Sequence, residues 1–135
     1  ICNVRIISAV NREPQKLIQE GKLRADLYFR LAVFDINLPP LRERTQDIKI
    51  LTAFFLETLG PVLGKKVTSI SPEVEKKFLK YSWPGNVREL RHVLHQSICM
   101  MKNNDLVLDE EHLPYNYLKI AAIFLKKQLC LKIWT

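Results

Sequence analysis

The first apolar stretch of the chain has the composition of a buried β-strand. The stretch from Cys2 to Val10 is short, rich in β-branched side chains and shows little alternation between apolar and polar positions. This pattern is typical of a strand covered on both faces of a parallel sheet. The only other β-like stretches are Val33 to Leu38 and Leu106 to Leu108. The chain therefore predicts at most a minimal sheet, or part of a larger one.

Two short helices are expected after this stretch. The first covers Pro14 to Glu20, with proline near its first turn and Gly21 as the C-terminal stop, and the second covers Arg24 to Leu31. The segment from Leu38 to Leu41 then interrupts regular structure, because its two consecutive prolines fix φ and lack N–H donors. This segment is the best candidate for a boundary between two parts of the chain.

Helical spacing dominates after residue 44. One helix is expected to end at Gly60-Pro61, a second to begin with Ser71 as N-cap, and a third to begin with Asn86 as N-cap and Glu89 as its capping-box partner. Their apolar positions recur at three- and four-residue steps: Ile48, Leu51, Phe55 and Leu59; Val74, Phe78 and Leu79; Val87, Leu90, Leu94, Ile98 and Met101. Residues 45–114 therefore predict a small helical bundle.

Composition and charge narrow the class of protein. At 135 residues, with 47% apolar and 26% charged residues, the chain has the composition of a globular domain. Of the net charge of +7, four lysines after residue 115 supply +4, and a basic chain favours polyanionic partners. Three cysteines without paired spacing argue against disulfides or a zinc site and fit a reducing cytosol.

The last segment, residues 115–135, is a basic and apolar tail of unknown role. Its apolar centre, Ile120 to Leu125, is far shorter than the ~20 residues that span a bilayer, so no membrane partner is expected. A helix that lies on a membrane surface or docks on a partner is one interpretation. A poorly ordered end is the other, and we favour it.

Arginines are the residues that suggest chemistry. Arg88 falls in the first turn of the helix predicted to begin at Asn86, where the helix dipole disfavours a cation by ~0.3–1 kcal/mol. An anionic ligand would offset that cost, since helix N–H groups and a guanidinium together form a phosphate site. The alternative is an exposed arginine paired with Glu89 or with an acid of another helix.

Arg24 and Arg30 lie six residues apart and would face different sides of one helix. Arg30 could simply pair with Asp26 at i,i+4, whereas an arginine from a neighbouring subunit can stabilise a transferring phosphoryl group. Arg42 and Arg44 follow the double proline, as surface charges or as ligands at the junction.

Asn11 ends the predicted strand, at the edge where parallel sheets bind ligands, although an asparagine in a loop more often bonds to its own backbone. The histidines do not form a metal set, and the phosphate-binding loop G-x-x-x-x-G-K-[ST] and the motifs G-x-S-x-G and H-E-x-x-H are missing from the sequence. Without any family resemblance, the sequence therefore indicates arginines that could bind an anion but no catalytic centre.

Three strings occur in one order: Arg24-Ala-Asp-Leu-Tyr-Phe-Arg-Leu31, Leu38-Pro-Pro-Leu-Arg-Glu-Arg44 followed by Asp47-Ile48, and Trp83-Pro-Gly-Asn-Val-Arg-Glu-Leu90. Together they resemble the AAA+ central domain of the bacterial sigma-54-dependent transcription activators, the enhancer-binding proteins. The likeness covers residues 1 to about 114. It implies an α/β fold class, mostly helical by content: residues 1–44 resemble the C-terminal end of the P-loop core, with one or two strands and short helices, and residues 45–114 resemble the all-helical lid.

The resemblance implies roles for the same polar residues. Asn11 falls in the sensor I segment, although Val10 stands where the family usually has threonine. Arg24 and Arg30 match the arginine fingers that reach the ATP of the adjacent subunit, and Arg88 matches sensor II. Arg42 and Arg44 lie in the connection between core and lid, which borders the nucleotide.

The resemblance also implies cofactors and partners. The intact family domain binds ATP and Mg²⁺ as a homo-hexameric ring, remodels RNA polymerase carrying sigma-54, and reaches DNA through other domains, in the cytoplasm. The family's Walker motifs and sigma-contacting loop have no counterpart in this sequence, so the chain alone is expected to hold no cofactor firmly and to be inactive as an ATPase. The alternatives are a basic DNA-binding module and an inactive remnant.

Overall fold

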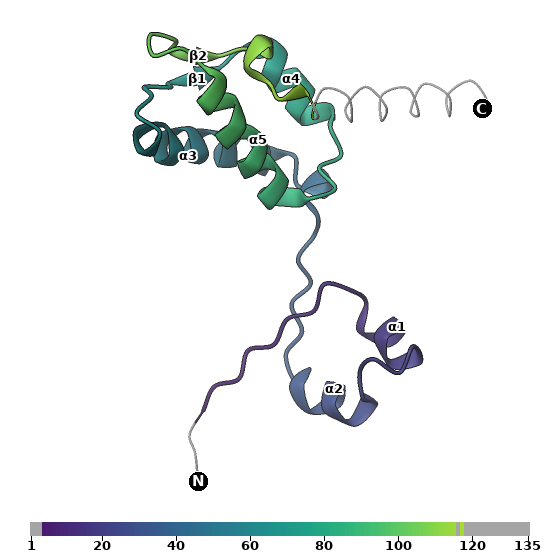
Figure 1. Ribbon diagram of the computed structural model, residues 1–135. Coiled ribbons are helices and arrows are strands. Elements are labelled where there is room, and N and C mark those ends of the chain that lie inside the picture. Colours follow the sequence, from purple (N-terminus) through teal and green to yellow (C-terminus); the bar gives the residue numbers. More distant parts are fainter. Residues whose placement is uncertain (1–3, 116, 118–135) are drawn as a thin grey trace, which may run out of the picture. The chain divides into compact units, whose positions relative to one another are not determined.

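The computed structural model describes residues 4–115 and Tyr117 (Figure 1). The chain divides into two compact units, residues 1–38 and 39–135, so the division falls directly before the double proline. The described part is mainly helical and holds one two-stranded parallel sheet, which agrees with the expected class.

The first unit contains the two short helices that the sequence predicts. Helix α1 spans Pro14–Gln19 and α2 spans Ala25–Leu31. Gly21 has φ 68°, its N–H bonds to the carbonyl of Ile18, and the next N–H, of Lys22, bonds to the carbonyl of Leu17. This pair of bonds is a Schellman motif, which only glycine forms without steric cost at that position. The predicted stop of the first helix is therefore confirmed.

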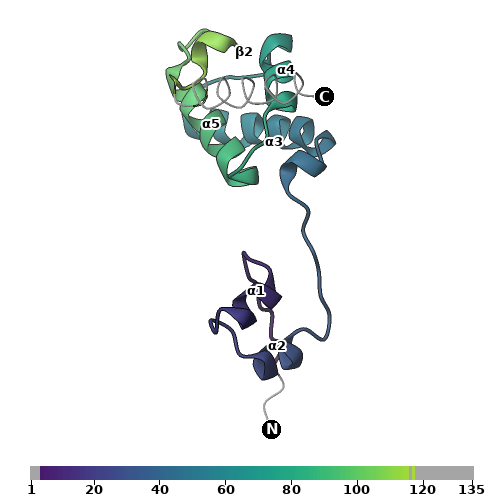
Figure 2. The same ribbon diagram turned by 90° about the vertical axis from the view of Figure 1, so that its right-hand side faces the viewer.

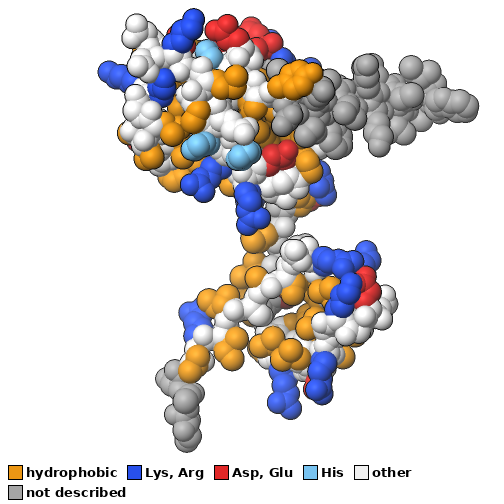
Figure 3. Space-filling model, viewed as in Figure 1, with side chains coloured by type: hydrophobic (Ala, Val, Ile, Leu, Met, Phe, Trp, Pro, Cys, Tyr) orange, Lys and Arg blue, Asp and Glu red, His pale blue; other side chains and the backbone are white. Residues whose placement is uncertain are grey.

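The two strands predicted for the first unit are wrong for its described residues. Residues 4–10 and 33–38 form no strand, and no described residue of this unit is buried. A strand covered on both faces exists only where neighbours accept its hydrogen bonds and cover its side chains, and the described residues supply no such neighbours. Apolar side chains are therefore exposed along both stretches (Figure 3), among them Ile7 at 85%, Val33 at 86% and Phe34 at 83%.

The second unit is the predicted helical bundle. Helices α3 (Gln46–Val62), α4 (Pro72–Lys80) and α5 (Asn86–Met100) form it, with the short 3₁₀ turns η1 (Leu41–Glu43) and η2 (Glu110–His112). Helix α5 lies along α3 in both ribbon views (Figures 1 and 2). Strand β2 (Val107–Leu108) confirms one short β-like stretch, whereas its partner β1 (Ser69–Ile70) was not expected.

The first bundle helix continues one residue beyond its predicted end. Pro61 lies inside the last turn of α3, and Gly64, with φ 67°, follows the end of the helix. The N–H groups of Gly64 and Lys65 bond back to the carbonyls of Pro61 and Gly60, which again satisfies the terminal carbonyls. A proline in the last turn removes only one donor, so the helix continues through Pro61 to Val62, and Gly64 forms the turn that follows.

The predicted apolar positions form one core in the second unit. Phe78, Leu90, Leu94 and Ile98 are fully buried, and Ser71 begins α4 as expected, with its hydroxyl accepting the N–H of Val74. Burial of such side chains removes apolar area from water, and this is the main stabilising contribution to the bundle.

Trp83 is at the centre of an aromatic cluster within this core. It is fully buried, its indole N–H donates to the carbonyl of Phe78 at 2.8 Å, and its ring contacts Phe78, Tyr81 and Tyr117. Tyr117 is only 3% exposed. It falls within residues 115–135, the segment predicted as a tail. Apart from Tyr115 and Tyr117, that segment lies outside the described residues, and so do both interpretations of it. In the part described, no helix is long and apolar enough to cross a membrane.

Candidate functional site

The candidate site is centred on the turn that precedes α5. Gly85 is the N-cap residue and Asn86 is the first helical residue, so the prediction of Asn86 as N-cap is wrong. Glu89 still acts at the cap: one carboxylate oxygen accepts the N–H of Gly85 at 2.8 Å, and the other accepts the hydroxyl of Tyr81 at 2.9 Å. The capping box is incomplete because the N-cap residue, Gly85, has no side chain that could accept a helix N–H.

Asn86 joins this turn to the segment after the double proline. Its side-chain oxygen accepts the backbone N–H of Leu41 at 2.8 Å, across 45 residues of sequence. Leu41 is fully buried and begins the 3₁₀ turn η1, which contacts α5. The bond therefore brings the segment that carries Arg42 and Arg44 to the same end of the bundle as the first turn of α5.

Arg88 lies in this first turn and is exposed. The expected alternative, a pair with Glu89, is not formed, since both carboxylate oxygens of Glu89 accept other donors. Among the described residues Arg88 has no ion-pair partner. A cation in the first turn of a helix opposes the helix dipole, so this guanidinium is in a position that favours an anionic ligand.

The other two arginines of this end have only weak neighbours. Arg42 is 3.5 Å from a carboxylate oxygen of Glu43, and Arg44 is 3.5 Å from Asp47. The Nε atom of Arg44 is buried without a hydrogen-bond partner among the described residues. Exposed pairs at this distance contribute at most ~1 kcal/mol, so an anionic ligand could displace them.

Tyr81 is held in its protonated form. Burial, followed by the hydrogen bond to Glu89 and its charge, raises the pKa of Tyr81 well above its usual range. The hydroxyl therefore remains a donor to Glu89 at neutral pH, and Glu89 remains bonded to the N-cap. Glu89 therefore stabilises the turn that precedes Arg88.

In the first unit, Arg24 and Arg30 have different surroundings. Arg24 is the N-cap of α2, its side chain is 82% exposed, and its Nε and Nη2 donate to the two carboxylate oxygens of Asp26 at 3.0 Å each. The pair of Asp26 with Arg30 that the spacing suggested is not formed. Arg30 is exposed in the last turn of α2 and has no ion pair among the residues described.

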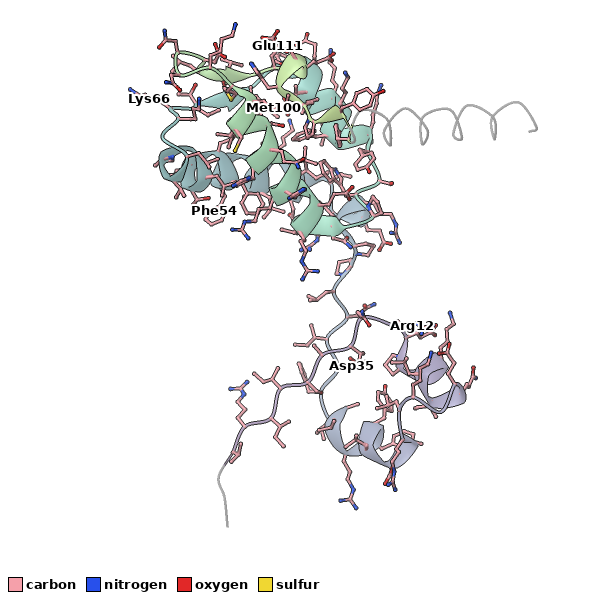
Figure 4. All side chains as sticks on the ribbon, viewed as in Figure 1. Arg12, Asp35, Phe54, Lys66, Met100 and Glu111 are labelled. Atoms are coloured by element: carbon pink, nitrogen blue, oxygen red, sulfur yellow. The ribbon has the colours of Figure 1, made fainter. Side chains whose placement is uncertain are left out.

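Asn11 is exposed in a bend before α1. It does not end a strand, because the strand itself is not formed. Next to it, Arg12 makes two hydrogen bonds to Glu20, at 3.0 and 3.2 Å, and so links the two ends of α1 (Figure 4). The sequence analysis missed this pair, because a separation of eight residues follows no helical spacing rule.

The histidines take no part in this site. His92 and His95 are exposed on α5, and His112 is buried, with its Nδ1 accepting the N–H of Asp109. Cys99 is free and exposed. In the described ranges there is no group of three or more His, Cys, Asp or Glu side chains that could hold a metal ion.

The comparisons identify the class of protein. Residues 42–123 match the family described as the AAA+ ATPase lid domain, and residues 1–37 match the Sigma-54 interaction domain. The chain belongs to the AAA+ family of sigma-54-dependent activators and covers the C-terminal part of its AAA+ domain. These likenesses give no support to the alternative of a separate DNA-binding module.

Individual relatives agree with this class. The chain is 39% identical over 114 residues to the anaerobic nitric oxide reductase transcription regulator NorR of Salmonella paratyphi C, covering 82% of this chain and 22% of that protein. NorR of Citrobacter koseri is 38% identical over the same length, with the same shares covered. The chain therefore spans about a fifth of the length of these curated relatives.

Solved structures show the same fold. NtrX from Brucella abortus in complex with ADP matches with a TM-score of 0.76 and 31% identity, over 87% of this chain and 27% of that one. NtrX in complex with ATP matches with a TM-score of 0.75 and 31% identity, over 85% and 26%.

Proposed function

We propose that this chain supplies the lid and the adjoining end of the α/β core of an ATP-hydrolysing AAA+ ring that activates sigma-54-dependent transcription. Residues 1–44 would form the end of the core and residues 45–114 the lid, with residues 115–135 as a following segment. The family membership of the chain supports this function. The nucleotides named for NtrX support ATP as the ligand class.

One observation carries the proposal: Arg88 is exposed and has no carboxylate partner in the described residues, at a helix start that the Asn86–Leu41 bond joins to Arg42 and Arg44. Three guanidinium groups at one end of the bundle can donate to phosphate oxygens, and the positive end of the α5 dipole favours the same anion. Arg88 would then contact the phosphates of a nucleotide as sensor II. Arg42 and Arg44 would border the nucleotide from the connection between core and lid.

Arg24 and Arg30 would act on the ATP of the neighbouring subunit as arginine fingers. The exposed pair of Arg24 with Asp26 contributes only ~0.2–1 kcal/mol, so a γ-phosphate could replace it. Arg30 is exposed without an ion pair in the described part. A guanidinium from an adjacent subunit stabilises the charge of a transferring phosphoryl group. Asn11 would serve in the sensor I segment.

The residues present fit phosphate but not Mg²⁺. Arginines can bind a triphosphate, whereas the described residues include no cluster of three carboxylates or other metal ligands. Mg²⁺ would therefore be held by residues other than these. The intact protein would work in the cytoplasm as a homo-hexamer on RNA polymerase carrying sigma-54 and would reach DNA through other domains.

A chimera tests this function. Residues 1–123, which include the buried Tyr117 and end where the lid-family match ends, would replace the matching segment of Brucella abortus NtrX, the protein whose structures with ADP and ATP share this fold. We expect ATP hydrolysis by the chimera. Arg24→Ala or Arg30→Ala should abolish turnover and leave nucleotide affinity within about two-fold, because a trans-acting arginine contributes to catalysis by ~10³–10⁵-fold.

Arg88→Ala should weaken nucleotide binding instead, by about 10- to 150-fold, the loss of one charge-assisted contact of ~1.5–3 kcal/mol. Arg91→Ala is the matched control, since Arg91 is an exposed arginine of the same helix beyond its first turn. Its nucleotide affinity should equal that of the parent. If both Arg24→Ala and Arg30→Ala hydrolysed ATP at the parent rate, the finger assignment would be wrong.

A further inference from the structure

The turn before α5 contains two unusual backbone conformations. Trp83 has φ 48° and Asn86 has φ 51°, and they are the non-glycine residues with positive φ in the part of the chain that the structure describes. This left-handed region is unfavourable for residues with a Cβ, and most of all for bulky ones. Such conformations persist only where surrounding contacts hold them, and they are enriched at functional sites.

The two residues are held by different contacts. Trp83 is held by the core, through its indole N–H bond to the carbonyl of Phe78 and its ring contacts. Asn86 is held by its backbone N–H, which donates to the carbonyl of Trp83 at 2.8 Å, and by its side-chain bond to Leu41, also at 2.8 Å. The core therefore holds Trp83, whereas one of the two contacts of Asn86 joins it to another segment.

Few other backbone N–H groups near Leu41 could replace it as the donor to Asn86. The two residues before Leu41 are prolines, which have no N–H. Leu41 is thus the first residue after Leu38 whose backbone N–H can donate, and its acceptor belongs to the first residue of α5. Only residues 42–45 separate Leu41 from the start of α3, and they include Arg42 and Arg44.

We propose that Asn86 is a positioning residue for the nucleotide. Its bond to Leu41 holds the segment of residues 39–44 against the first turn of α5, so that Arg42, Arg44 and Arg88 move together as one phosphate-binding unit. This inference rests on the proposed function. Asn86 itself need not touch the nucleotide, because it acts through the placement of the three arginines.

The first experiment measures the link itself in the 135-residue chain. Asn86→Gly accepts the positive φ without strain but lacks the side-chain acceptor, whereas Asn86→Asp keeps an acceptor oxygen at the same place. Amide hydrogen exchange, followed residue by residue by NMR, should show the Leu41 N–H exchanging at least ten-fold faster in Asn86→Gly. In Asn86→Asp it should exchange at the parent rate. Equally slow exchange of Leu41 in the glycine variant would overturn the link.

The second experiment measures the consequence in the chimera with NtrX. Asn86→Gly should raise the KM for ATP about ten-fold with kcat within two-fold of the parent, and Asn86→Asp should restore the parent KM. Asn103→Gly is the matched control: Asn103 lies in the turn after α5 and accepts a bond from Lys65, so the same substitution there should leave KM unchanged.

The possible outcomes separate the two proposals. A parent KM in Asn86→Gly, in a protein where Leu41 exchanges fast, would overturn the positioning role and leave the proposed function intact. A chimera in which the parent sequence binds no ATP would overturn the proposed function and this role together, while the exchange of Leu41 would still show that the link exists. A KM raised equally by the glycine and aspartate variants would indicate a general effect of substitution and would also reject the role.

Discussion

Removing the ring of Tyr117 should strongly destabilise the second unit. Tyr117 is 3% exposed, and its ring packs edge-on against Phe78 and Tyr81 and in a stacked arrangement against Trp83, with centroids 5.8, 5.0 and 5.7 Å away. Burial of a side chain of this size contributes ~1.5–3 kcal/mol, and each aromatic pair adds ~0.5–1.5 kcal/mol. We expect Tyr117→Ala to lower the free energy of unfolding by ~3–5 kcal/mol, the usual cost of truncating a buried aromatic residue.

The loss is large against the ~5–15 kcal/mol that stabilises an ordinary domain. It should be measured by urea unfolding of the 135-residue chain at 25 °C, followed by circular dichroism. In a thermal melt the same variant should unfold at least ~12 °C below the parent, since 1 kcal/mol corresponds to ~4–8 °C for a unit of this size.

Two further variants identify the cause. The Tyr117 hydroxyl is buried and has no hydrogen-bond partner among the described residues, and burial raises the pKa of this group. Tyr117→Phe should therefore be neutral or stabilise the unit by up to ~1 kcal/mol, because an unpaired buried polar group is removed. Tyr115→Ala, at a residue that is 68% exposed, should change the stability by less than ~0.5 kcal/mol. Equal losses in Tyr115→Ala and Tyr117→Ala would refute the assignment of Tyr117 to the core.

Two other predictions concern a helix cap and a glycine. The pKa of Asp109 lies below its ordinary value of 3.8, chiefly because its carboxylate accepts the backbone N–H of Glu110 and then because it accepts the hydroxyl of Ser71. The ionised carboxylate therefore stabilises the folded state above pH 3.8. This stabilisation is lost as the pH falls through the lower pKa of the folded state. Asp109→Asn should remove this acid-dependent loss, as urea unfolding at neutral pH and at about pH 3 would show. Gly64→Ala should cost ~1–2 kcal/mol of unfolding free energy, since Gly64 has φ 67° and open space around it. Gly21→Ala, with φ 68° and equally open space, should leave the cooperative melt of the bundle unchanged, because no described residue of its own unit is buried; a matching loss at both glycines would contradict this reasoning.

Most large apolar side chains of the first unit are exposed, which distinguishes it from the second. Val4, Ile6 and Ile7 are each at least 70% exposed, and so are Val33 and Phe34. Side chains of this type are normally buried, but no described residue of this unit is buried. The β-branched pattern alone does not produce a strand, because the described residues cannot form the ladder that a strand needs.

Local chemistry made the helices of both units predictable from the sequence. Apolar residues at three- and four-residue steps, Ser71 as a cap and Gly21 as a stop act within one turn of their own position, so that their effects can be read without knowledge of the fold. The resemblance in the three motifs indicated the family for the same reason, since each motif is a continuous string.

Contacts between distant segments were decided by the tertiary structure. The bond from Leu41 to Asn86 spans 45 residues, and no spacing rule predicts it; it took the side chain that was expected to cap α5 and left Gly85 as the cap. The same holds for Glu89, which bonds to Tyr81 instead of Arg88, and for β1, a two-residue strand that exists only because β2 lies beside it. The sequence by itself determined which segments are helical, and it predicted which arginines are candidates for binding phosphate. The packed core determined which of those side chains were already engaged and which, like Arg88, were left without a carboxylate partner in the described part of the chain.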